Sequence, residues 1–214
     1  MKSPKPKKCR ECKAEFMPHN STQSVCGYGC AIKQVNKKKI SDHVKVRNDW
    51  YEKNATPEIK KKELQPLINK IARLIDYQQP CIATGSFEGK QNGGHYISVG
   101  SNATIRFNLH NIHVQSEHSN SFKSGDTIRY QDGIVKVYGQ EYLDYMNSLK
   151  GTPVLKLTKE QINEAIVVCK AIIKELEGDL IVRTPSERIE LRQKLNEKIG
   201  FYKNKYNDLI KKEK

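Results

Sequence analysis

The sequence predicts an α+β chain: a small N-terminal cysteine module, a central β-β-α unit, and helices that flank this unit and close the chain. Three observations support this fold class: two close cysteine pairs, a stretch rich in β-branched residues and glycine turns, and long apolar stripes at helical spacing. The expected regions are the cysteine module, a basic helical arm, the β-β-α domain and a C-terminal helical hairpin, at 1–35, 36–78, 79–150 and 151–214.

The chain carries a large excess of positive charge. Its 214 residues are enough for one or two domains with a core. There are 38 Lys and Arg against 24 Asp and Glu, a formal net charge of +14, and residues 1–70 hold ten of this excess. The asymmetry favours a polyanionic partner, nucleic acid first and an acidic membrane surface second, over a merely solvated lysine-rich surface.

The sequence contains no membrane or export signal. No run approaches the roughly 20 apolar residues that span a bilayer, and the opening residues MKSPKPKK lack the apolar stretch of a secretory signal. We therefore expect a cytoplasmic protein with no membrane partner. In a reducing compartment its six cysteines are thiols or metal ligands rather than disulfides.

Cys9, Cys12, Cys26 and Cys30 form two pairs, each suited to a tight turn that presents two thiolates. Four thiolates complete a tetrahedral zinc shell with no open position, so the expected Zn²⁺ is structural and not catalytic. The alternative is four small core cysteines. It is disfavoured because 22 residues with two aromatic side chains cannot build a core without a cross-link.

The following segment is polar and rich in lysine, and includes Lys37, Lys38 and Lys39. It is interpreted either as a solvated helix or as an arm that lies along DNA phosphates, and the clustering of charge favours the arm. Thr56 and Pro57 mark the start of the next helix. Pro66 is expected to break or restart this helix.

The central region, 79–130, alternates short apolar runs with glycine turns. We expect strands at 95–99 and 105–108, a loop at 111–114, and a helix that begins within 118–130, followed by a further helix from Gln140. Beyond them, Thr158 and Thr184 each open a long helix, the first with a capping box. These two helices form either a hairpin or a dimer contact.

Three side chains of the central region suggest chemistry. A short hairpin followed by a helix start could bring His95, Asn111 and Asn120 together. One imidazole and two carboxamides in a strongly basic chain favour metal-assisted attack on a phosphodiester. Each residue alone fits a turn or loop role better, but their joint spacing favours a site. Arg106 and Lys123 are candidate phosphate contacts.

The chain resembles a known family over most of its length. The motifs that carry the resemblance are CRECKAEF and CGYGC, Gly94-His95-Tyr96, Arg106-Phe107-Asn108, Asn111-Ile112-His113, Gln115, Asn120 and Lys123-Ser124-Gly125. Together they resemble the NinG (Rap) recombination endonucleases of lambdoid phages, within the HNH (ββα-metal) nuclease superfamily. The central unit is therefore expected to be an HNH-like nuclease domain. A phage protein of this family is expected to act in the cytoplasm of the bacterial host.

The resemblance implies a role for each matching position. His95 matches the general base, Asn111 the central Asn of the motif, and Asn120 its third residue, a ligand of Mg²⁺ or Mn²⁺. His113 matches a family His of less certain role, and it or Asn92 is expected to join the metal shell. Asn111 is expected to orient the His95 ring or to help hold the metal.

The chain departs from the family pattern at two places. A second zinc knuckle usually frames the site, but the corresponding positions here are Cys81, Thr84, Ser116 and Ser119, and one thiol cannot hold zinc. In addition, Asn92 precedes two glycines where a metal-binding Asp commonly stands before the His. A carboxamide is a poorer ligand than a carboxylate for a hard cation.

These features predict a metal-dependent endonuclease that cuts Holliday junctions or other branched recombination intermediates. Symmetric cleavage of a four-way junction needs two active sites, so a homodimer is expected. Two alternatives remain: a non-catalytic zinc-finger DNA-binding protein with a degenerate HNH scaffold, and a restriction-like nuclease that cuts linear duplex.

Overall fold

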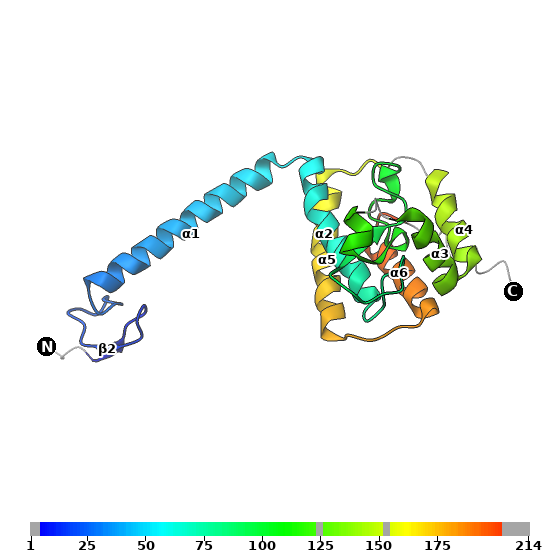
Figure 1. Ribbon diagram of the computed structural model, residues 1–214. Helices are drawn as coiled ribbons and strands as arrows, with labels where there is room; N and C mark the ends of the chain where they lie inside the picture. Colours follow the sequence, from blue (N-terminus) through cyan, green and yellow to red (C-terminus); the bar gives the residue numbers. More distant parts are fainter. Residues whose placement is uncertain (1–4, 123–125, 152–154, 203–214) are drawn as a thin grey trace. The chain divides into compact units, whose positions relative to one another are not determined.

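A computed structural model describes residues 5–122, 126–151 and 155–202 of the chain (Figure 1). The chain divides into two compact units, Met1–Ala55 and Thr56–Lys214. The boundaries expected from the sequence after residues 35, 78 and 150 differ from this division. The reason is that helices on both sides of the central region share one core with it.

The first unit combines a small hairpin with one long helix. Strands β1 (Lys7–Lys8) and β2 (Glu15–Phe16) pair antiparallel, with Lys7 opposite Phe16. Helix α1 (Tyr28–Asn54) is 27 residues long and has no buried residue. The lysine-rich segment is therefore a continuous solvated helix, and its role as an arm along DNA stays a prediction.

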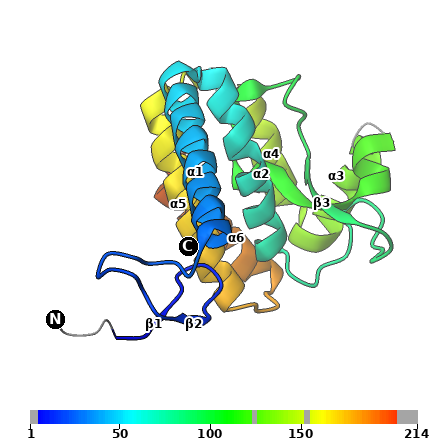
Figure 2. The same ribbon diagram turned by 90° about the vertical axis from the view of Figure 1, so that its left-hand side faces the viewer.

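The second unit packs helices around one two-stranded sheet, which agrees with the predicted α+β class. In Figure 2, α2 lies between α5 and β3. The elements, with short 3-10 or π turns labelled η, are α2 (Pro57–Ile75), β3 (Gln91–His95), η1 (Ala103–Ile105), η2 (Leu109–Asn111), β4 (Ile112–Ser116), η3 (His118–Phe122), α3 (Thr127–Tyr138), α4 (Gln140–Ser148), η4 (Leu149–Gly151), α5 (Lys159–Gly178) and α6 (Pro185–Ile199).

Helix α2 begins where the sequence predicted and continues through a proline. The Thr56 side chain accepts a hydrogen bond from the Ile59 N–H, and Pro57 occupies the first turn. The predicted break at Pro66 is wrong, because the helix runs on to Ile75. Burial of its apolar face outweighs the one hydrogen bond that proline removes. That face consists of Leu64, Ile68, Ile71, Ala72 and Ile75.

The central sheet is displaced from its predicted position. Strands β3 and β4 pair antiparallel, from Gln91 opposite Ser116 to His95 opposite Ile112, so the expected strands at 95–99 and 105–108 and the expected loop at 111–114 are wrong. Gly93 and Gly94 lie inside β3 because their neighbours leave no space for a side chain. A Cβ at Gly93 would lie 2.8 Å from the Asn69 carbonyl oxygen, and one at Gly94 would overlap Gln115.

Beyond β4 the chain makes a π turn, η3, and helix α3 starts only at Thr127. The expected helix start within 118–130 is therefore confirmed, while the helix from Gln140 appears as α4. Gly133 in α3 allows close packing, because a Cβ there would overlap the carbonyl oxygen of Ile82. A ββα-metal identity for this region remains a prediction.

The last two helices begin after Thr158 and Thr184, as the sequence predicted, and the second has a capping box that was expected only for the first. Thr158 and Gln161 form a capping box at α5, and Thr184 and Glu187 form another at α6. Helix α5 packs along α2, and α6 contacts both helices. No helix in the described part of the chain is long and apolar enough to cross a membrane.

Candidate functional site

The four N-terminal cysteines converge on one point. The sulfur atoms of Cys9, Cys12, Cys26 and Cys30 all lie within 4.8 Å of one another, and the Sγ atom of Cys26 is 3.6 Å from those of Cys12 and Cys30. Thiolates bound tetrahedrally to zinc at 2.3 Å are about 3.8 Å apart. The arrangement therefore fits a four-thiolate zinc site.

The environment of Cys9 favours its ionised form. Burial raises the pKa of this thiol, but backbone N–H groups of Cys12, Cys26 and Glu11 donate to the sulfur and lower its pKa to about 6. The N–H of Cys26 lies 3.4 Å from the Cys9 Sγ atom. A sulfur that already accepts backbone hydrogen bonds is suited to metal ligation.

Helix α1 starts at this cluster and presents the predicted basic residues. Lys37, Lys38 and Lys39 are exposed, and the Nζ of Lys37 lies 2.6 Å from the Oε1 of Glu11 in the cysteine module. This ion pair is exposed, so its contribution to stability is small. Two of the three lysines thus make no ion pair within the described residues and are available to polyanions.

In the second unit, His95 ends strand β3 and is held by a backbone carbonyl. Its Nε2 lies 2.9 Å from the carbonyl oxygen of Arg106. Because a carbonyl oxygen only accepts, Nε2 carries the hydrogen and Nδ1 carries the lone pair of the neutral ring. Burial lowers the pKa of His95, and the nearby Arg106 charge lowers it further. The imidazole is therefore a neutral base with Nδ1 as the accepting atom.

Arg106 connects this histidine to helix α2 through its side chain. Its Nε donates to the Oε1 of Gln65 at 2.8 Å, and the Nε2 of Gln65 donates to the Oδ1 of Asn69 at 2.7 Å. The Nε2 of Gln65 also lies 3.4 Å from the His95 Nε2. Both atoms carry hydrogens in this arrangement, so we regard the approach as a contact rather than a hydrogen bond.

A pocket of about 460 Å³ opens beside this network. It brings together three of the residues predicted for the site, Asn92, Arg106 and Asn120, and adds Lys62 and Arg73. The described lining contains these three cationic side chains and no carboxylate. The pocket is therefore suited to a phosphate group.

The carboxamides of Asn92 and Asn120 offer two neutral oxygens to a divalent cation. Mg²⁺ keeps several waters and is usually held by carboxylates together with substrate phosphates. Three cationic side chains line this pocket, so the described residues do not suit a resident cation by themselves. They suit one whose anionic ligands arrive with a phosphate.

Asn111 is fully engaged in holding the backbone. Its Oδ1 accepts from the Ile97 N–H at 2.8 Å, and its Nδ2 donates to the carbonyls of Ile97 and Ile105 at 2.9 and 3.4 Å. Its side chain is directed at the segment after His95, not at the imidazole. The observed contacts make it a brace for this segment.

His113 lies on the opposite face of the hairpin from His95. Opposed residues of β3 and β4 share a face, and successive residues alternate, so His113 shares a face with Gly94 while His95 shares one with Ile112. The Nδ1 of His113 lies 3.1 Å from the hydroxyl of Tyr130. His113 lines a different pocket from the one that contains Asn92 and Asn120.

The four positions expected for a second zinc knuckle, Cys81, Thr84, Ser116 and Ser119, hold one thiol and three hydroxyl groups. The thiol of Cys81 is hydrogen-bonded by Thr84 and Ser116, and the Ser119 N–H donates to the Ser116 hydroxyl at 3.3 Å. Hydrogen bonds therefore connect the two arms of the motif. The predicted phosphate contact Lys123 lies outside the described residues.

Comparison with known proteins identifies the relatives of this chain. Residues 1–179 match the family described as Bacteriophage Lambda NinG protein. The chain belongs to the NinG family. Protein ninG of Enterobacteria phage H19B is 29% identical over 177 residues, which cover 69% of this chain and 83% of the relative. Protein ninG of Escherichia phage lambda is 34% identical over 88 residues, or 41% and 43% of the two chains. No solved structure matches.

Membership of the NinG family is thus confirmed, while HNH superfamily membership stays a prediction. The family match ends one residue after α5, so helix α6 of this NinG protein lies outside it. The sequence did not predict the role of Gln65, a residue of α2 whose Oε1 accepts a hydrogen bond from the Arg106 side chain. A single glutamine on an exposed-looking helix carries no local signal for such a role.

Proposed function

We propose that this NinG protein is an endonuclease that cuts branched DNA, such as Holliday junctions, with His95 as its general base. The observation that carries the proposal is the phosphate-suited pocket of Asn92, Arg106 and Asn120. Two residues that line it, Gln65 and Arg106, contact the neutral imidazole of His95 through its Nε2, which leaves Nδ1 as the accepting atom. Nucleases of this kind need a base near a cationic phosphate site. The HNH resemblance of the same residues supports this assignment.

The residues divide the work of hydrolysis as follows. His95 takes a proton from the attacking water through Nδ1, while the Arg106 carbonyl holds the opposite ring nitrogen and its proton. Lys62, Arg73 and Arg106 bind the phosphate oxygens and offset their charge. Asn92 and Asn120 would hold a divalent cation that arrives with the phosphate. This cation, Mg²⁺ or Mn²⁺, supplies charge stabilisation at the leaving oxygen.

The first unit is proposed to supply DNA affinity. The zinc-stabilised module presents the exposed lysines of α1, and such contacts release counterions from DNA. Binding should therefore weaken steeply as salt rises. Symmetric cleavage of a four-way junction needs two active sites, so we propose that the protein acts as a homodimer.

A second function is favoured by one observation, the lack of a carboxylate in the described lining of the pocket. If the cation does not bind, the protein is a zinc-containing DNA-binding protein with an inactive scaffold. The two functions predict the same DNA affinity. They differ in cleavage alone.

The deciding experiment incubates purified, zinc-loaded protein with a four-way junction and with linear duplex of the same sequence, each with Mg²⁺, with Mn²⁺ and without either cation. Preferential, metal-dependent cutting of the junction is expected, and His95→Ala should reduce the rate roughly 10²–10⁴-fold with DNA binding retained. Cleavage by His95→Ala at the wild-type rate would remove the base assignment. Binding without any cleavage would favour the non-catalytic function.

A further inference from the structure

A separate pocket of about 360 Å³ lies on the face of the hairpin that carries His113. Its walls come from the segment after α2, from β4, from α3 and from the first turn of α6. Ile82, Val137 and Tyr138 make part of the wall apolar. This size and mixed lining fall within the range of small-molecule sites.

His113 contributes a buried acceptor to this pocket. The Tyr130 hydroxyl donates to the Gly94 carbonyl at 3.0 Å, so its oxygen accepts from the His113 backbone N–H and from Nδ1–H, both at 3.1 Å. Nδ1 therefore carries the hydrogen, and Nε2 carries a lone pair. His113 is 1% exposed, and its Nε2 has no hydrogen-bond partner among the described residues. A buried acceptor of this kind requires a donor.

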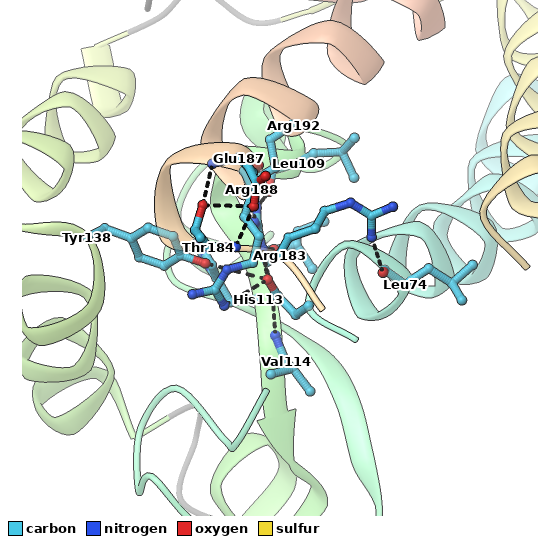
Figure 3. Close-up of polar contacts among 12 residues, drawn as sticks. Leu74, Leu109, His113, Val114, Tyr138, Arg183, Thr184, Glu187, Arg188 and Arg192 are labelled. Carbon is cyan, nitrogen blue, oxygen red and sulfur yellow. Dashed lines mark hydrogen bonds and ion pairs between the residues drawn. The ribbon is translucent and has the colours of Figure 1, made fainter. Parts of the chain in front are cut away.

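Arg188 contributes a buried donor to the same pocket. It is 4% exposed, its Nη1 lies 3.5 Å from the Oδ1 of Asp76, and its guanidinium lies 5.0 Å from the centre of the Tyr138 ring (Figure 3). Its Nε–H finds no acceptor in the described part of the chain. The pocket wall therefore holds one unmatched acceptor and one unmatched donor.

Two further cations line the pocket from the exposed side of α3. Arg129 and Lys136 are both exposed, and the Arg129 side chain is 59% exposed. Arg129 lies 3.9 Å from Asp126, a long ion pair whose carboxylate side chain is 13% exposed. The exposed Asp132 lines the pocket beside Arg129 and Lys136, so α3 contributes two cations and one carboxylate to it. The site thus combines a donor, an acceptor and apolar walls with two cations and one carboxylate from α3.

We infer that this pocket binds a nucleotide unit, with an unpaired nucleobase against His113 and Arg188 and its phosphate at Arg129 and Lys136. The Watson–Crick edge of each nucleobase presents a donor beside an acceptor, which matches the two unmatched groups. Apolar and aromatic walls suit a flat base. The base comes either from a free nucleotide or from a base displaced out of a DNA strand.

This inference rests on the proposed nucleic-acid partner but not on cleavage, because the pocket lies on the hairpin face opposite His95. A site for a displaced base would favour branched or distorted DNA over regular duplex. Arg188 belongs to α6, outside the family match, whereas the other residues that line the pocket lie within the match.

The test measures binding of the zinc-loaded full-length protein, by fluorescence anisotropy without added Mg²⁺ or Mn²⁺, to a duplex with one bulged adenosine. The comparison duplex has an abasic residue at the bulge, which keeps every phosphate and removes only the base. Removal of the base should weaken binding about tenfold. Binding of dAMP, followed by NMR, tests the free nucleotide as the alternative source.

The variants locate the effect. His113→Leu removes the acceptor and Val137→Trp fills the pocket, and each should abolish the difference between the two duplexes; the second keeps the test informative if the first fails to fold. Arg129→Ala with Lys136→Ala should weaken binding of the bulge. Lys170→Ala with Lys174→Ala, on the exposed face of α5, loses the same charge and should keep the difference.

The outcomes separate this inference from the nuclease proposal. Equal affinity for both duplexes, with no dAMP binding, would show that the pocket holds only water and would overturn the inference. Binding of dAMP with no base dependence in DNA would assign the site to free nucleotides. A protein that discriminates the bulge but cuts no junction would keep the inference and reject the nuclease.

Discussion

Arg192 and Asp76 form a buried ion pair in which the Nη2 of Arg192 lies 2.7 Å from both carboxylate oxygens. The Arg192 and Asp76 side chains are 0% and 1% exposed. Oδ2 of Asp76 also accepts from the Val114 N–H at 3.0 Å, and the Nε of Arg192 donates to the Leu109 carbonyl. Val114, Arg192 and Leu109 are labelled in Figure 3. The pair therefore joins the end of α2, strand β4 and helix α6.

Removal of one partner of this pair should destabilise the second unit strongly. Arg192→Ala leaves the Asp76 carboxylate buried without its main partner, and such a loss costs about 3–5 kcal/mol of unfolding free energy. Urea unfolding measures the change, with the exposed Lys194→Ala on the same helix as the control. A loss below about 1 kcal/mol would show that α6 is not integral to the unit.

Local signals in the sequence predicted the helix starts, and long-range contacts decided what they missed. Thr56, Thr158 and Thr184 cap helices because capping depends on residues three positions apart. In contrast, Asp76 and Arg192 are 116 residues apart, and no local pattern connects them. The position of the Asp76–Arg192 pair depends on burial against neighbours that the sequence alone does not reveal.

The central sheet shows the same limit at shorter range. Gly93 and Gly94 are typical of a turn, but close approach of Asn69 and Gln115 places them inside β3. For the candidate site, the motif predicted Asn92, Arg106 and Asn120, which line one pocket. The strand alternation that places His113 on the opposite face from His95 follows from a register that the sequence alone did not fix.

Metal removal should unfold the first unit and leave the second folded. We expect about one zinc per chain, and Cys26→Ser should lose most of it because four-thiolate sites contribute on the order of 10 kcal/mol or more to folding. Elemental analysis and circular dichroism with and without chelator measure the two effects. Cys169→Ala removes a thiol buried in α5 and should retain the zinc. Two zinc ions per chain would contradict the hydrogen-bonded replacement of the second knuckle.

Stability should fall as pH drops below the ordinary histidine range. Burial lowers the pKa of His110 to about 3 and holds the pKa of His113 well below 6.5. The unfolded chain therefore binds protons that the folded chain does not as pH falls from 6.5 towards 3. The expected loss is about 1.4 kcal/mol per pH unit for each histidine.

Urea unfolding at pH 7.5 and 5.5 measures this loss. Both pH values lie above the range where most carboxylates titrate, so the histidines dominate the change in stability. His110→Gln should remove one part of the pH dependence and leave the parts of His113 and of His95, whose pKa burial also lowers. Equal stability of the wild-type protein at both pH values would mean that these histidines are not held neutral.

The last prediction concerns Gln65, which holds the Arg106 guanidinium at 2.8 Å while the Arg106 carbonyl holds His95 at 2.9 Å. Gln65→Leu frees the Arg106 side chain, so the cleavage rate should fall roughly tenfold or more through lost positioning of the phosphate. Junction affinity should change little, because α1 supplies it. Gln65→Glu keeps an oxygen acceptor for Arg106 and should recover most of the rate.

The pH profile distinguishes positioning from a change in the base itself. A general base acts when unprotonated, so activity should fall as pH drops through the His95 pKa, which burial places below the usual 6.5. Gln65→Leu should lower the whole profile, because the Arg106 carbonyl that fixes the His95 tautomer is part of the backbone. A Gln65→Leu enzyme with unchanged rate, or Gln65→Glu with no recovery, would remove the positioning role. An acid limb absent from the wild-type profile between pH 4.5 and 7 would instead reject His95 as the base.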